Sequence, residues 1–109
     1  MSIRTEIISE INLLAHPSMQ LDYEKDVPSA NVVAELFSSF CDDLYHPKNA
    51  EMLSEFSEDE LKDLAHLYGV LIEASNTDAS SVSELIKQPK WRRVISVAQK
   101  LHEQYLRHT

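Results

Sequence analysis

Glycine is almost absent from this chain of 109 residues, in which Gly69 is the only one. Sheets joined by tight turns and loops that hold phosphate groups need several glycines, for backbone positions with positive φ and for close backbone approach. A chain without them folds most readily as helices with short connections. The sequence therefore predicts an all-α protein, and its length suits a single helical domain over residues 1–109 with one hydrophobic core.

Two main helices are expected in the first half of the chain. Apolar side chains recur every three or four positions in residues 2–15, and Pro17 ends this helix because the residue before a proline avoids helical angles. Residues 17–28 are polar and have no clear period, so we expect a loop there with room for one helical turn. The next helix should begin with Ser29 as its N-cap and end at residues 46–47. Its apolar face is expected to contain Val33, Phe37, Phe40 and Leu44, widened by Val32 and Leu36.

The second half of the chain contains the clearest helix start, a capping box at residues 57–60. The helix that follows should last to about Ser75. Its core face is expected to contain Leu61, Leu64, Tyr68, Leu71 and Ile72. Short helices are expected after Pro47 and after Ser81, and Pro89 suits the first position of the last helix, whose apolar face contains Trp91, Val94, Ala98, Leu101 and Tyr105. We predict an irregular bundle of four main helices with one or two short extra helices.

The helix that begins near residue 58 has a wider apolar arc than one stripe requires. Leu67, Val70 and Ala74 lie beside the expected core face. Such an arc indicates either a central helix or an apolar surface that meets a second chain. A homodimer is therefore possible on the sequence alone.

The overall composition limits the partners and the compartment. Eighteen Asp and Glu residues against ten Lys and Arg give a formal net charge of −8, which disfavours nucleic acid and anionic membranes and favours a basic protein partner. Glu6 and Glu10 interrupt the stretch that a signal peptide would keep apolar, and no apolar run approaches the roughly 20 residues of a membrane-spanning helix. Cys41 is the only cysteine, which fits a reducing compartment. We predict a cytoplasmic protein that does not enter a membrane.

Acidic and basic residues are separated along the chain. All but one of the acids lie in residues 1–86, whereas residues 87–109 contain Lys87, Lys90, Arg92, Arg93, Lys100 and Arg107. Three interpretations are open: the basic residues neutralise acids within the fold, the acidic body meets a basic partner, or the last helix contacts nucleic acid. In the third, Trp91 would stack on a base. The apolar period of the last helix favours Trp91 as a core residue instead.

Two matching motifs, Asp43-x-x-His46 and Asp63-x-x-His66, are the strongest candidates for chemistry. Their spacing resembles the Glu-x-x-His pairs of di-iron helical bundles, which implies a shared metal. The helical period puts Asp63 and His66 opposite the core face, so we expect a solvated polar surface and no bound metal. Residues 65–69 also resemble the phosphotransfer histidine motif of HPt domains, which implies a phosphoryl acceptor at His66, although the lysine of that motif is missing.

No enzymatic motif is found in the sequence. Asp42 and Asp43 should raise the pKa of the Cys41 thiol and weaken it as a nucleophile, and phosphate-binding and dinucleotide-binding fingerprints are absent. We therefore predict a non-enzymatic protein-binding module without a cofactor, such as an inhibitor, immunity-type protein, antitoxin or adaptor, that recognises a basic protein. The expected contacts are the acids without a neighbouring base, namely Asp42, Asp43, Glu55, Glu58 and Asp59. The alternatives are a nucleic-acid-associated regulator acting through Lys90, Arg92 and Arg93, or a histidine-based metal or phosphoryl site.

Overall fold

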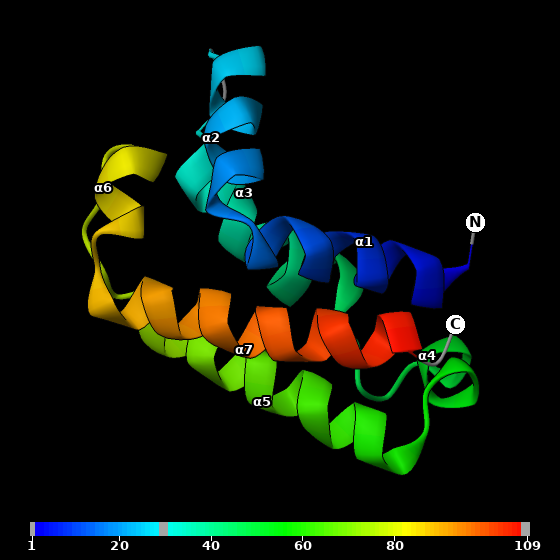
Figure 1. Ribbon diagram of the computed structural model, residues 1–109. Helices are drawn as coiled ribbons and strands as arrows, with labels where there is room; N and C mark the ends of the chain where they lie inside the picture. Colours follow the sequence, from blue (N-terminus) through cyan, green and yellow to red (C-terminus); the bar gives the residue numbers. More distant parts are fainter. Residues whose placement is uncertain (1, 29–30, 108–109) are drawn as a thin grey trace.

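The computed structural model describes residues 2–28 and 31–107, with side chains to residue 105. Three long helices lie side by side in this part of the chain: α1 (Ile3–Ala15), α5 (Glu58–Ala74) and α7 (Pro89–Arg107) (Figure 1). Helix α7 lies between the other two and runs in the opposite direction to both. The described residues form helices and no strand, which confirms the predicted all-α bundle. No helix among them is long and apolar enough to cross a membrane.

Helix α1 follows the sequence prediction closely. The Ser2 hydroxyl caps it by accepting a hydrogen bond from the backbone N–H of Thr5 at 3.1 Å. Its core face is buried and consists of Ile7, Ile11, Leu14 and Ala15. The helix ends at His16, immediately before Pro17.

The segment after α1 is a helix, α2 (Pro17–Asp26), and the prediction of a loop is wrong. Pro17 occupies the first helical position, where no N–H donor is needed. The fully buried Gln20 amide donates two hydrogen bonds, of 3.0 and 3.1 Å, to carbonyl oxygens at the end of α1 and accepts one of 3.1 Å from Trp91 Nε1. Polar contacts of this kind, invisible to an apolar period, hold α2 in place.

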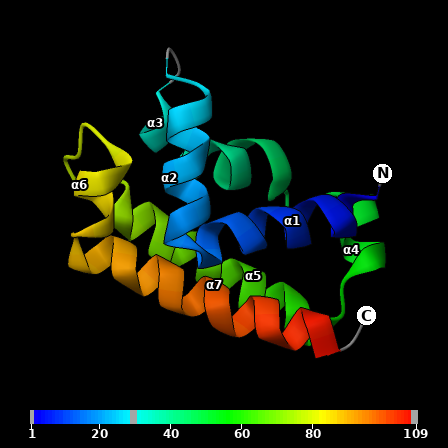
Figure 2. The same ribbon diagram turned by 45° about the horizontal axis from the view of Figure 1, so that its top comes forward.

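Helix α2 stands across the end of α1 and lies beside α6 (Val82–Ile86) (Figure 2). The Glu24 carboxylate accepts a hydrogen bond of 2.9 Å from the backbone N–H of Val82. Ser81 caps α6 as predicted, accepting from the N–H of Glu84 at 3.2 Å. Together, α2 and α6 close the end of the bundle at which α5 finishes and α7 begins.

The second predicted helix differs in its start and in its buried face. It begins as α3 (Val32–Ser38), which Asn31 caps, and continues as the π-helical segment η1 (Ser39–Leu44). The predicted cap, Ser29, lies outside the described residues. Val32, Leu36 and Phe40 are buried at a spacing of four, whereas Val33, Phe37 and Leu44 are partly buried. The core face thus keeps Phe40 of the predicted stripe and otherwise consists of Val32 and Leu36 on its flank.

Helix α4 (Ala50–Glu55) begins three residues after the predicted Pro47, because the Asn49 side chain caps it. Helix α5 then begins as predicted. Both hydrogen bonds of its capping box form, from Ser57 N–H to Glu60 Oε1 at 2.9 Å and from Glu60 N–H to the Ser57 hydroxyl at 3.2 Å.

The buried face of α5 is rotated from the predicted one. It consists of Leu64, Leu67, Val70, Leu71 and Ala74, whereas Leu61 and Tyr68 are partly buried and Ile72 is 43% exposed. Leu67 and Val70 therefore belong to the core of one chain. The apolar surface on which the homodimer prediction rested does not exist at these residues.

Candidate functional site

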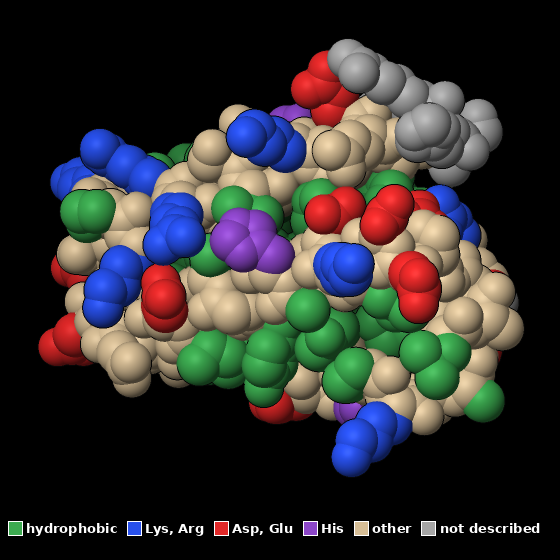
Figure 3. Space-filling model, turned by 90° about the horizontal axis from the view of Figure 1, so that it is seen from below, with side chains coloured by type: hydrophobic (Ala, Val, Ile, Leu, Met, Phe, Trp, Pro, Cys, Tyr) green, Lys and Arg blue, Asp and Glu red, His purple; other side chains and the backbone are tan. Residues whose placement is uncertain are grey.

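The predicted partner-binding acids do not form one surface. Asp42 borders a cavity of about 330 Å³ between α3, η1 and the C-terminal end of α5, where it lies near Ile72. Asp59 lies in the first turn of α5, and at about 1.5 Å per residue the helix separates these two places by roughly 20 Å. Hydrophobic side chains form a band along the face of the molecule seen from below, the side of α5 in Figure 1 (Figure 3).

One of the predicted acids has a basic neighbour after all. Glu55 Oε2 accepts a hydrogen bond of 3.0 Å from the backbone N–H of Arg4, and the Arg4 side chain donates to the Glu55 carbonyl oxygen at 2.9 Å. Glu55 is predicted as an acid without a neighbouring base, and this is wrong because Arg4 is distant in the sequence and close in the fold. Asp43, Glu58 and Asp59 are exposed, as the prediction requires.

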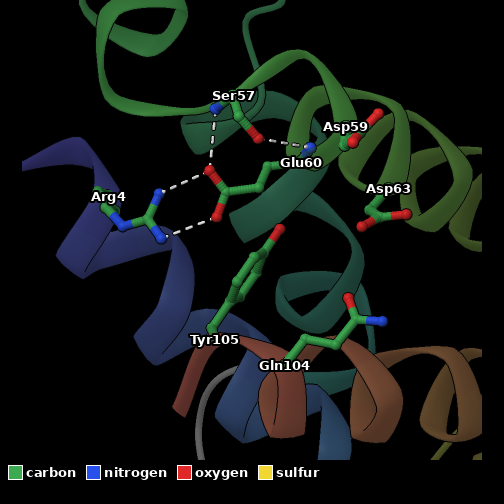
Figure 4. A pocket seen from close by; sticks show the side chains of 7 residues that line it. All are labelled: Arg4, Ser57, Asp59, Glu60, Asp63, Gln104 and Tyr105. Carbon is green, nitrogen blue, oxygen red and sulfur yellow. Dashed lines mark hydrogen bonds and ion pairs between the residues drawn. The ribbon is translucent and has the colours of Figure 1, made fainter. Parts of the chain in front are cut away.

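A pocket of about 550 Å³ lies at the start of α5 (Figure 4). Three helices form it, since α1 contributes Arg4, α7 contributes Gln104 and Tyr105, and the first turns of α5 contribute Ser57, Asp59, Glu60 and Asp63. Of the predicted contacts, Asp59 alone lines this pocket. Asp42, Asp43, Glu55 and Glu58 are not among the side chains that line it.

Arg4 and Glu60 form the wall of the pocket. The guanidinium donates to both Glu60 oxygens, at 3.1 and 2.8 Å, and lies over the rings of Phe56 and Tyr105, with its carbon 5.0 and 5.6 Å from their centres. The hydrogen bonds from Arg4 lower the pKa of Glu60 to about 2. Arg4 thereby neutralises Glu60 and holds Tyr105 in position.

Three acceptor groups of the pocket are left without a partner. Tyr105 is only 1% exposed, and its hydroxyl has no hydrogen-bond partner among the described residues. It points toward the space between Glu60 and Asp63 (Figure 4), and burial, followed by these two charges, raises its pKa. Asp59 and Asp63, one helical turn apart on α5, form no ion pair with any described residue.

The histidine motifs do not bring a cluster of metal ligands together in the described residues. His46 Nε2 lies 3.2 Å from the backbone carbonyl oxygen of Asp43, at the end of η1, and makes no hydrogen bond to the carboxylate. His66 is exposed on α5. No three His, Cys, Asp or Glu side chains of the described chain come together as metal ligands.

Cys41 and Trp91 have the environments expected of structural residues. Cys41 is half-buried, and burial, followed by the charge of Asp42, raises the pKa of its thiol to about 11. Trp91 is fully buried and donates to Gln20, so it cannot stack on a base, and its assignment to the core is confirmed. Lys90, Arg92 and Arg93 are exposed.

Among the described side chains, one basic residue of α7 forms an ion pair with an acid of another helix, α5. Arg93 Nη1 lies 3.5 Å from Glu73 Oε2, and both side chains are more than half exposed. Arg92 instead donates to the carbonyl oxygen of Ile86 at 3.3 Å. A surface ion pair of this kind contributes little stability.

Removal of the Arg4 side chain tests the wall of the pocket. Arg4→Ala should lower the free energy of unfolding by about 1–2 kcal/mol, because it breaks a bidentate, partly solvent-screened ion pair. The low pKa of Glu60 stabilises the fold above pH 4.5, and this contribution is lost as the pH falls toward 2. Urea unfolding at pH 7 and pH 3 should show a smaller loss for Arg4→Ala at pH 3.

Arg93→Ala is the matched control, since it removes an arginine from an exposed ion pair. It should change the free energy of unfolding by less than about 0.5 kcal/mol. An equal effect of the two substitutions would contradict the role given to Arg4.

The pocket therefore offers carboxylates and a hydroxyl. Such a set of groups provides acceptors that can hold a cation. The sequence contains a partial signal for it, because Asp59 and Asp63 are four residues apart beside a capping box. Comparison with models of protein families, with curated proteins and with solved structures gives no match for this chain.

Proposed function

We propose that this protein is a non-enzymatic binding module that recognises a basic protein through the acidic surface at the start of α5. The observation that carries this proposal is the pocket in which the exposed Asp59 and the partly buried Asp63 form no ion pair with a described residue, beside a third acid that Arg4 neutralises. Glu58 extends the same surface. Exposed charges of one sign attract an oppositely charged protein and increase its association rate.

The half-buried Cys41 thiol supports a reducing compartment, and we assign the protein to the cytoplasm on this basis. A homodimer stays a prediction. Its remaining support is the hydrophobic band that Figure 3 shows, together with the exposed side chain of Ile72 on α5. Light scattering at several protein concentrations would test it.

Association with the partner should depend on acids at the start of α5 and on salt. Affinity capture from the native cell, followed by mass spectrometry, should return a protein with a basic face. The double variant Glu58→Lys and Asp59→Lys should slow its association about tenfold or more at low ionic strength, because electrostatic steering is lost. Raising the salt should slow association of the unchanged protein in the same way, since charges are screened beyond roughly 8 Å at physiological ionic strength.

The double variant Asp42→Lys and Asp43→Lys is the control, because it makes the same change of charge at the other end of α5. A smaller effect of this variant shows that the position of the acids matters, and thermal unfolding of both variants checks that each is folded. The nucleic-acid alternative makes the opposite prediction. It would be supported if capture returned nucleic acid and if Arg92→Glu with Arg93→Glu abolished binding.

A further inference from the structure

Resting on the proposed function, we propose that the pocket between α1, α5 and α7 is a socket for one lysine side chain of the partner. The ammonium group would be held by Asp59 and Asp63 at the rim and by the Tyr105 hydroxyl at the floor (Figure 4). The proposal assigns a ligand class to the pocket and a binding role to Tyr105, which the apolar pattern of α7 places in the core.

The Tyr105 hydroxyl is the observation that points to a ligand. A buried hydroxyl without a hydrogen-bond partner is unfavourable, and native structures contain few of them. This one lines the pocket, and the cation of Arg4 packs over its ring. Arg4 forms hydrogen bonds with Glu60 and Glu55 and none with the Tyr105 hydroxyl. A donor that enters from outside would give the hydroxyl the partner that the chain does not provide.

The charges of the pocket favour a cation. Asp59 and Asp63 are four residues apart on one face of α5, where like charges repel each other. The single positive charge of Arg4 is matched by Glu60, so both aspartates are left uncompensated. A bound cation relieves this repulsion, whereas an anion would increase it.

The shape of the acceptor set favours an ammonium group. Two carboxylates and one hydroxyl come from two different helices, and they provide separate acceptors for a group with three N–H donors. A guanidinium group instead prefers a fork of two acceptors on one carboxylate. The cavity of about 550 Å³ lies within the usual range of small-ligand pockets and accommodates the four-carbon lysine chain.

The test uses a small probe, so that it does not depend on knowing the partner. Nα-acetyl-lysine methylamide is titrated into the protein and followed by ¹H–¹⁵N NMR, with the norleucine analogue, which lacks the ammonium group, as the matched ligand. Shifts at the amides of Asp59, Asp63 and Tyr105 with the lysine probe, and not with norleucine, are expected. Equal shifts with both probes, or tighter binding of the arginine analogue, would overturn the proposal.

Variants separate binding from folding. Tyr105→Phe keeps the ring under Arg4 and removes the hydroxyl, so the protein should remain as stable while lysine-probe affinity falls about tenfold. Asp59→Asn with Asp63→Asn should abolish binding. Asp78→Asn makes the same chemical change at an exposed position between α5 and α6 and should have no effect. Unchanged probe affinity in Tyr105→Phe would refute the role of the hydroxyl.

The two proposals can fail separately. If the lysine probe binds the pocket but no basic protein is captured, the proposed function is wrong and the socket for an ammonium group stands. If a basic protein binds and the Glu58 and Asp59 reversal weakens it, while Tyr105→Phe leaves both the probe and the protein unaffected, the acidic surface stands and the socket is wrong.

Discussion

Trp91→Ala should lower the free energy of unfolding by about 3–5 kcal/mol, the usual loss when a large buried aromatic side chain is truncated. Trp91 is fully buried at the start of α7, with its ring edge-to-face to Phe37 at 5.1 Å between centres. Its N–H also supplies the hydrogen bond to Gln20, so the truncation leaves that buried amide oxygen without its donor. Urea unfolding followed by circular dichroism measures the loss.

Two neighbouring substitutions make this result specific. Trp91→Phe keeps an aromatic ring and removes the N–H, so its loss should be smaller. Arg92→Ala changes the next, exposed residue and should shift the free energy of unfolding by less than about 0.5 kcal/mol. If Trp91→Ala left the stability unchanged, Trp91 would not be the core residue that the structure describes.

Glu10→Gln should stabilise the protein by about 2–3 kcal/mol at pH 8 and have little effect near pH 4.5. Burial, followed by the charge of Asp43, raises the pKa of Glu10 from 4.5 to about 7, and its Oε1 atom is buried without a partner. Between pH 4.5 and 7 the folded protein keeps a proton that the unfolded chain releases. Stability therefore falls as the pH rises through this window, by about 1.4 kcal/mol per unit at most.

Urea unfolding of both proteins from pH 4.5 to 8 measures this difference. Glutamine is uncharged over the whole range, so the slope between pH 4.5 and 7 should be smaller in the variant. Glu6→Gln, one turn earlier on the same helix at an exposed position, should keep the original slope. A variant at Glu10 with the original pH dependence would show that another group titrates in this window.

The parts of the fold that the sequence predicts are those encoded by neighbours in the chain. The start of α5 depends on Ser57 and Glu60, three residues apart, and the face of α7 on a regular apolar spacing from Trp91. Helix α2 was not predicted, because the residue that holds it in place, Gln20, is polar and has its hydrogen-bond partners on α1 and α7. A period of apolar residues cannot register a buried amide.

The pocket could be predicted only in part, for the same physical reason. The sequence predicts Asp59 as a contact because it is an acid without a neighbouring base, and in the structure Asp59 lines the pocket. Arg4 is 56 positions from Glu60 in the sequence, so their ion pair could not be predicted. The helical spacing of apolar residues in α7 indicates only that Tyr105 is a core residue. The ion pair and the unpartnered hydroxyl arise only when α1, α5 and α7 pack together.

The two ends of the described chain meet at the pocket, which includes Arg4 from the first helix and Gln104 and Tyr105 from the last. Any affinity tag or fusion partner joined to either end would therefore sit beside the proposed binding surface and could compete with a basic partner for it. An immobilisation point in the turn at residues 76–80, between α5 and α6 at the opposite end of the bundle, leaves that surface open. A capture experiment that fails with a terminal tag should be repeated from this attachment point.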